Sequence, residues 1–132
     1  MKVVDFLKNA KVFYVSTCDG DQPRVRPIGF VMEYNGQLAF NTDTRKNMFK
    51  QLKANPKIEI SAIDENLNSL RITGRANFIT SEDSQKAALE AMPMLAKIGY
   101  TVGDGIFEIY TLDDVAISYT SMTGKQLDGI EL

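Results

Sequence analysis

The chain has 132 residues, 44% hydrophobic and 24% charged, with a formal net charge of −2 at pH 7. This length is enough for one domain, residues 1–132. The acidic balance argues against a general nucleic-acid-binding protein. The absence of histidine and the single cysteine, Cys18, exclude an intrachain disulfide, a histidine-based catalytic triad and the usual zinc sites. No apolar run approaches the roughly 20 residues that span a bilayer, and the N-terminus is too charged for a signal peptide, so we expect a cytoplasmic protein without a membrane partner.

The N-terminal half predicts two helices and three strands joined by short turns. Runs of β-branched and aromatic residues are typical of strands, and apolar residues at helical spacing are typical of helices packed on a core. On these signals we expect helices at residues 3–9 and 45–54 and strands at residues 11–18, 24–34 and 37–41. The Asp-Gly pair at 19–20 and the Asn-Gly pair at 35–36 favour hairpin turns, and Asn55-Pro56 ends the second helix.

The C-terminal half predicts four more strands and a third helix. We expect the strands at residues 57–63, 69–79, 106–111 and 115–119. Ser81 can cap a helix that begins with two acidic residues and is broken by Pro93. In the strand at 69–79 apolar and polar side chains alternate, which indicates one buried and one solvated face. Gly74 in the middle of this strand predicts a bulge or a close backbone approach.

Seven short strands with a few inserted helices favour the α+β class, mainly β, with the strands in an antiparallel barrel that is closed or nearly closed. A turn at Asp113-Asp114 is expected to separate the last two strands. The alternative to the barrel is a two-layer sandwich of a sheet and helices.

Two arginines on the predicted strand at 24–34 are candidates for binding an anion. Arg24 and Arg26 share a face with Ile28, where that face changes from cationic to apolar, so we place both at the rim of the barrel. A guanidinium there can clamp a phosphate or a carboxylate through two hydrogen bonds. The alternative is that both arginines are solvated charges at a sheet edge.

The helix predicted at 45–54 begins with two cations, Arg45 and Lys46. Cations are unfavourable near a helix N-terminus, because that end carries a partial positive charge. A bound anion would reverse the effect, since the free backbone N–H groups of the first turn point towards it. The alternative is that Asp43 neutralises the two cations.

Pro27, Ile28 and Gly29 place a proline and a glycine inside a predicted strand. Proline removes a ladder donor and glycine admits another group to the backbone, so the stretch indicates either an edge strand with a bulge or a place where a ligand meets the backbone. No carboxylate pair, activated thiol or metal cluster stands out. We therefore name no catalytic residue and no metal site, and redox chemistry would require a bound cofactor.

Four segments, taken in order, resemble the pyridoxamine 5′-phosphate oxidase-like FMN-binding split barrels. They are RVRPIGF at 24–30, FNTDTRKN at 40–47, QLKANPKIEI at 51–60 and RITGRANF at 71–78. In the family these positions carry a strand arginine, a threonine at a strand end, a phosphate loop with Lys or Arg, and an Asn-Pro pair that opens the next strand. The resemblance covers nearly the whole chain and is strongest to the small bacterial branch labelled general-stress or nitroimidazole-reductase-like.

The resemblance implies an FMN site at the interface of a homodimer. The implied contacts of one subunit are Arg26 to the FMN, the backbone of Pro27, Ile28 and Gly29 to the ring, Asn41 and Thr42 beside the ring or ribityl chain, and Lys46 and Asn47 to the phosphate. The second subunit would contribute the strand at 69–79 and the C-terminal segment, with Tyr119 and Ser121 as candidates. Counted back from QLKANP, the cations of this chain lie about two residues before the family's Arg-Lys pair.

The resemblance also implies an oxidoreductase like a flavin reductase or nitroreductase, with a small-molecule substrate and NAD(P)H as the candidate electron donor. The tail at 120–132 lacks the Arg-Pro motif with which the vitamin B6 enzyme binds its substrate, so pyridoxamine phosphate oxidation itself is not expected. One alternative is a flavin carrier or sensor without turnover. Another is a barrel that binds single-stranded nucleic acid, which Arg71 and Arg75 would support.

Overall fold

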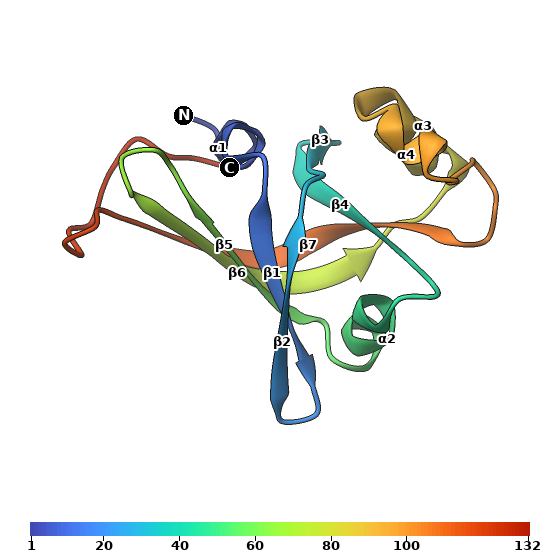
Figure 1. The fold of residues 1–132 in the computed structure, drawn as a ribbon, viewed down its shortest axis with the longest axis horizontal. Helices are drawn as coiled ribbons and strands as arrows, with labels where there is room; N and C mark the ends of the chain where they lie inside the picture. Colours follow the sequence, from blue (N-terminus) through green and yellow to red (C-terminus); the bar gives the residue numbers. More distant parts are fainter.

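The computed structural model describes all 132 residues and shows a mainly β fold, an antiparallel split barrel with helices at its periphery (Figure 1). The strands form one sheet in the order β2-β1-β5-β6-β7-β4-β3. They are β1 (Phe13–Asp19), β2 (Gln22–Ile28), β3 (Met32–Tyr34), β4 (Gln37–Asp43), β5 (Lys57–Ile63), β6 (Ser69–Phe78) and β7 (Phe107–Thr120). The helices are α1 (Val3–Ala10), α2 (Asn47–Ala54), α3 (Glu82–Ala91) and α4 (Met94–Lys97). The predicted fold class is therefore confirmed, as a barrel and not as a sandwich.

The barrel is closed by a short connection between the two edges of the sheet. β2 and β3 follow one another in the chain, yet they lie at opposite ends of the strand order, and only residues 29–31 join them. The prediction of a single strand at 24–34 is therefore wrong, because one regular strand cannot belong to both edges of a curled sheet. The hairpin turn at Asn35-Gly36 is confirmed, since both residues have the positive φ (51° and 78°) that a type I′ turn requires.

The longest strand, β7, crosses the sheet without the turn predicted at Asp113-Asp114. Instead, its register with β6 shifts between Thr73 and Arg75, and Asp114 has a φ of 53°. This irregularity is a bulge, in which the two strands do not match residue for residue. A Cβ on Gly74 would lie 3.0 Å from the carbonyl oxygen of Asp113, so glycine is needed where the two backbones come this close.

Two clusters of buried side chains stabilise the fold. The larger fills the barrel interior and contains the rings of Phe13, Phe40 and Tyr110, with centroids 5.5 to 5.9 Å apart. The smaller lies between the sheet and the α3–α4 pair, where Tyr100 stacks on Phe107 at 4.6 Å. None of the helices is long and apolar enough to traverse a bilayer.

Helix α2 lies beside the β1–β2 hairpin and buries Met48 and Leu52 in the barrel core (Figure 1). It ends at Ala54, as predicted, but it begins at Asn47, two residues later than expected. The reason is local: residues 44–46 form a turn in which the carboxylate of Asp43 accepts a hydrogen bond from a backbone N–H before the helix starts. The two cations of the predicted first turn therefore precede the helix.

Candidate functional site

The α2 cleft is the space between the β1–β2 hairpin and helix α2, with a volume of about 620 Å³. Its charged side chains are Arg24, Arg26, Lys50 and Asp19, three cations against one carboxylate. The amide side chain of Asn47 lines it as well. This balance favours an anionic ligand, because the cations attract it at close range.

Arg26 is held in the cleft by a closed hydrogen-bond network. Its Nη1 donates to the Thr17 hydroxyl at 2.7 Å, and its Nη2 donates to the Gln51 amide oxygen at 2.9 Å. The Thr17 hydroxyl donates in turn to the same Gln51 oxygen at 2.6 Å. As predicted, Arg26 lies on the same face of β2 as Arg24 and Ile28, and Ile28 packs against the barrel core. Each of β1, β2 and α2 thus supplies one member of the network.

Arg26 has no carboxylate partner although its side chain is half-buried. Arg24, in the same cleft, pairs with Asp19 at 3.2 Å, and Arg45 pairs with Asp43 at 3.1 Å. The partners of Arg26 are all neutral oxygen atoms. Burial lowers the pKa of Arg26, because removal from water disfavours the charged form. A bound anion would supply the missing counter-charge.

The N-terminus of α2 reaches the cleft through Asn47. Lys46 occupies the N-cap position without a capping hydrogen bond, and the first turn contains no acidic residue. The backbone N–H groups of that turn therefore have no side-chain acceptor, which is the arrangement that binds anions at helix ends. Lys46 itself is exposed and does not line the cleft, whereas Arg45 is neutralised by Asp43, as one of the two alternatives predicted.

The two candidate residues at the end of β4 point to opposite faces of the sheet. Thr42 shares the face of Phe40, in the barrel interior, and Asn41 shares the face of Ala39, which α3 and α4 cover. Thr42 is 1% exposed, and its hydroxyl has no hydrogen-bond partner. Because buried hydroxyls are normally paired, Thr42 retains the capacity for one more partner.

Asp43, next in the chain, is a buried carboxylate that the sequence indicated only as a counter-charge to two cations. It is 2% exposed and accepts hydrogen bonds from the Tyr100 hydroxyl at 2.6 Å and from Arg45 at 3.1 Å. Burial by itself would raise its pKa, but the hydrogen bonds from Arg45 and Tyr100 outweigh burial and lower the pKa to about 2. Asp43 therefore ties the end of β4 to a loop 57 residues away, a contact that no local pattern indicates.

The remaining candidates lie apart from the cleft. Pro27 and Gly29 are exposed at the edge formed by β2, whose backbone has a strand partner on one side only. The ring of Tyr119 packs against Phe6 of α1 with centroids 5.8 Å apart, and Figure 1 shows α1 away from α2. Ser121 lies in the turn that follows β7. One chain does not bring Tyr119 and Ser121 to the cleft, so their contribution from a second subunit stays a prediction.

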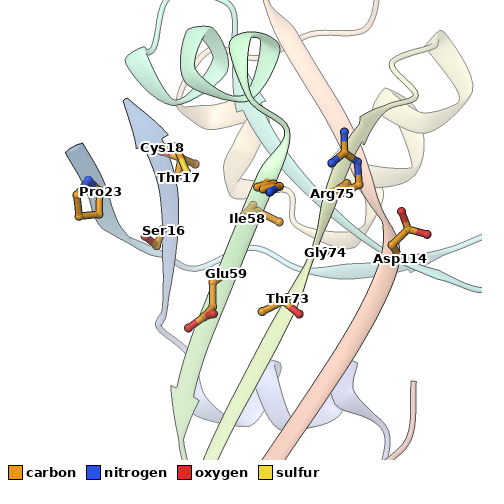
Figure 2. Close-up of a pocket in the computed structure, with 11 residues that line it drawn as sticks. Ser16, Thr17, Cys18, Pro23, Ile58, Glu59, Thr73, Gly74, Arg75 and Asp114 are labelled. Carbon is orange, nitrogen blue, oxygen red and sulfur yellow. The ribbon is translucent and has the colours of Figure 1, made fainter. Parts of the chain in front are cut away.

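A shallower depression of about 420 Å³ lies on the outer face of the sheet, and Figure 2 shows the side chains that line it. They come from five strands and include Arg75 of β6, Glu59 of β5 and Asp114 of β7. Lys57 lines it as well, so cations and carboxylates are mixed. Nucleic-acid-binding surfaces are usually continuous basic patches, and this depression has no such patch.

Comparisons with known proteins point to one family. A family model described as pyridoxamine 5′-phosphate oxidase matches residues 1–115. No curated protein sequence matches the chain. Among solved structures, the chain is similar to a NimC/NimA family protein from Clostridium acetobutylicum, with 39% sequence identity and a TM-score of 0.87; the match covers 94% of this chain and 88% of that chain.

Two solved structures of lower identity share the fold. One is General Stress Protein 26 from Bacillus anthracis, with 13% identity, a TM-score of 0.73 and coverage of 89% of each chain. The other is a pyridoxamine 5′-phosphate oxidase-related, FMN-binding protein from Nostoc punctiforme, with 20% identity, a TM-score of 0.64 and coverage of 89% of this chain and 77% of that chain. At these identities the likeness shows the fold alone.

Proposed function

The chain belongs to the pyridoxamine 5′-phosphate oxidase family, and from that premise we propose that it is an FMN-binding flavoprotein whose α2 cleft holds the phosphate of the cofactor. The family resemblance drawn from the four sequence segments is confirmed by the match over residues 1–115. The choice of flavin is supported by the Nostoc relative, which is described as FMN-binding.

The observation that carries the proposal is the uncompensated charge of Arg26. A half-buried guanidinium without a carboxylate partner faces a cleft that also holds the N-terminal residue of an uncapped helix. Burial of an unpaired charge is unfavourable. A phosphate dianion in the cleft would satisfy the guanidinium and the helix N-terminus together.

The residues present fit FMN in other respects as well. Arg26, Asn47 and the first turn of α2 would hold the phosphate, with Lys46 adding an exposed charge beside it. The free backbone edge of residues 27–29 offers hydrogen-bonding groups for the rest of the cofactor. Thr42 is buried inside the barrel and Asn41 lies on the opposite face of β4, so their contacts with the cofactor rest on the family resemblance alone. When bound, the flavin supplies electron-transfer chemistry, and the protein binds it, orients it and limits its contact with water.

We further propose that two copies of the chain form a homodimer through the outer face of the sheet. Val12, Tyr14, Val25 and Ile63, here called the outer apolar strip, are 48% to 67% exposed. They lie on β1, β2 and β5 or directly before them, on the face that points away from the barrel core. A second copy seated on this strip would remove its apolar surface from water. The contribution of Tyr119 and Ser121 to the partner's cofactor, which the family resemblance implies, is part of this proposal.

The proposed activity is that of an oxidoreductase like a flavin reductase or nitroreductase, with a small-molecule substrate and NAD(P)H as electron donor. It is supported by the family membership and by the Clostridium relative of the NimC/NimA family. We place the protein in the cytoplasm, where its free Cys18 would remain reduced.

The test is titration of the purified, flavin-free protein with FMN, followed by absorbance, fluorescence quenching and gel filtration. We expect one FMN per chain, retained at the elution volume of a dimer. A protein that stays colourless in excess FMN would overturn the proposal. Rapid mixing of the loaded protein with NADPH or NADH then separates an enzyme from a flavin carrier. Reduction no faster than that of free FMN would indicate the carrier.

A further inference from the structure

The network around Arg26 orients a cation without neutralising it. Arg24 and Arg45 are each bonded to a carboxylate, whereas Arg26 is bonded to a hydroxyl and an amide oxygen. A carboxylate in place of the Gln51 amide would give the same geometry but would cancel the positive charge that attracts an anion. Because its partners are neutral, the Arg26 guanidinium keeps its full positive charge.

The network also leaves donors free for a ligand. A guanidinium carries five N–H groups, and Arg26 uses only those of its Nη1 and Nη2 atoms within the chain. Its Nε makes no hydrogen bond to protein. Thr17 and Gln51 therefore fix the plane of the guanidinium while at least one N–H remains for the phosphate.

The third feature is the position of Gln51 on α2, one turn after the residues that begin the helix. Its oxygen accepts from Arg26 at 2.9 Å and from Thr17 at 2.6 Å, so it joins α2 directly to β1 and β2. Thr17 is 2% exposed, on the face of β1 that points into the barrel with Val15. The distance between the guanidinium and the N-terminus of α2 is thus set by side chains on three elements.

From this geometry we infer that Thr17 and Gln51 are positioning residues for phosphate recognition: they hold Arg26 and the N-terminus of α2 in the arrangement that binds one anion. The inference rests on the proposed FMN function and deepens it. Thr17 and Gln51 would therefore determine, through Arg26, the part of the FMN affinity that depends on the phosphate group.

The first experiment compares FMN with riboflavin, which lacks the phosphate, in flavin-free protein. Thr17→Val removes the hydroxyl at nearly constant volume, and Thr17→Ser keeps it. We expect Thr17→Val to raise the Kd for FMN about tenfold, the usual effect of a lost hydrogen bond to a charged group, with the Kd for riboflavin unchanged within about twofold. Thr17→Ser should bind FMN as the wild type does. Equal weakening of both ligands by Thr17→Val would mean a merely structural role and would overturn the inference.

The second experiment is a double-mutant cycle between Gln51 and Arg26. Gln51→Ala should weaken FMN binding about tenfold in the wild-type background and have no further effect once Arg26→Ala is present, because the residue acts through Arg26. Gln51→Glu should weaken it more than Gln51→Ala, since the new carboxylate neutralises Arg26. Additive effects in the cycle would show that Gln51 contacts the phosphate independently and would contradict the inference.

The cycle also separates this inference from the function on which it rests. If the wild-type protein binds neither FMN nor riboflavin, the proposed function fails and the inference falls with it. If the wild type binds FMN but the Thr17 and Gln51 variants keep its ratio of FMN to riboflavin affinity, the function stands and the inference alone is wrong.

Discussion

Arg26 and Asp43 show opposite ways of placing a charge in this protein. Asp43 is almost fully buried and is satisfied within the chain by Arg45 and Tyr100. Arg26 is half-buried and has no opposite charge within the chain. The first arrangement stabilises the folded protein by itself, whereas under the proposed function the phosphate of FMN would complete the second. At the scale of single residues, this difference separates structural charge from binding charge.

The pairing of Asp43 predicts a loss of stability in acid. Its pKa of about 2 lies below the usual value near 3.9 of an unfolded chain. Its contribution is therefore present above about pH 4 and is lost as the pH falls towards 2. Asp43→Asn should lower the free energy of unfolding at pH 7 by about 2 kcal/mol and by much less at pH 2. Urea denaturation at both pH values measures this, and an equal loss at the two would contradict it.

At the scale of elements, the site depends on where α2 begins. Three residues of turn precede the helix, and its N-cap is a lysine that cannot accept a hydrogen bond from the first turn. Helix α3, in contrast, begins with a complete capping box between Ser81 and Ser84. The N-terminus of α3 is therefore capped by side chains, whereas the N-terminus of α2, at the cleft, has no side-chain cap.

This contrast predicts that stability and FMN binding respond in opposite directions at Lys46. Lys46→Asp supplies a capping acceptor and should raise the stability of the flavin-free protein by about 1 kcal/mol. It should also weaken FMN binding, because the carboxylate would occupy the open N–H groups and repel the phosphate. Thermal melting and FMN titration measure the two effects.

The matched control for the helix ends is Ser81→Ala, which removes the cap of α3. It should lower stability by about 1 kcal/mol and leave FMN affinity unchanged. Unchanged FMN affinity in Lys46→Asp would indicate that the phosphate lies elsewhere.

The bulge between β6 and β7 gives a prediction that is independent of any ligand. Gly74→Ala would place its Cβ 3.0 Å from the carbonyl oxygen of Asp113, so the backbone must move. We expect a loss of about 1–3 kcal/mol in the free energy of unfolding. Gly29→Ala is the control, because its Cβ would lie at an ordinary 3.6 Å from the nearest atom. A Gly74→Ala variant as stable as Gly29→Ala would show that the bulge relaxes freely.

At the scale of the whole molecule, the split barrel brings the β1–β2 hairpin and α2 together and keeps the C-terminal candidates away from the cleft (Figure 1). A cofactor that met both groups would have to lie between two copies of the chain. The outer apolar strip is the exposed surface on which we propose that the second copy is seated.

The proposed dimer predicts that one charge on the outer apolar strip separates the subunits. Val25→Glu, at a side chain 67% exposed, should shift gel filtration from dimer to monomer without lowering the stability of the monomer fold. Val25 also lines the α2 cleft, so the FMN affinity of this variant does not report on the interface. Ile98→Glu is the control, since Ile98 is 65% exposed directly after α4, outside the strip and the proposed site. A Val25→Glu protein that remains dimeric would place the interface elsewhere.

Local patterns in the sequence were sufficient for most elements of this protein. Alternation and turn residues located β5 without error and the Asn35-Gly36 hairpin, because these signals depend only on neighbouring residues. They also predicted the face that Arg26 shares with Arg24 and Ile28, and the family resemblance assigned Asn47 to the phosphate. Both residues line the α2 cleft, and their binding of an anion stays a prediction. The four segments and their order were sufficient to identify the family.

Tertiary structure decided what depends on residues far apart in the chain. Closure of the sheet into a barrel divided the predicted strand at 24–34 into β2 and β3. The pairing of β7 with β6 gave a bulge where the sequence had predicted a turn. The hydrogen bond between Thr17 and Gln51 spans 34 residues, that between Gln51 and Arg26 spans 25, and that between Tyr100 and Asp43 spans 57. No local pattern encodes these contacts, because their partners meet only when the sheet has curled into a barrel. The sequence thus determined which elements form, and packing decided which cation remained without a counter-charge.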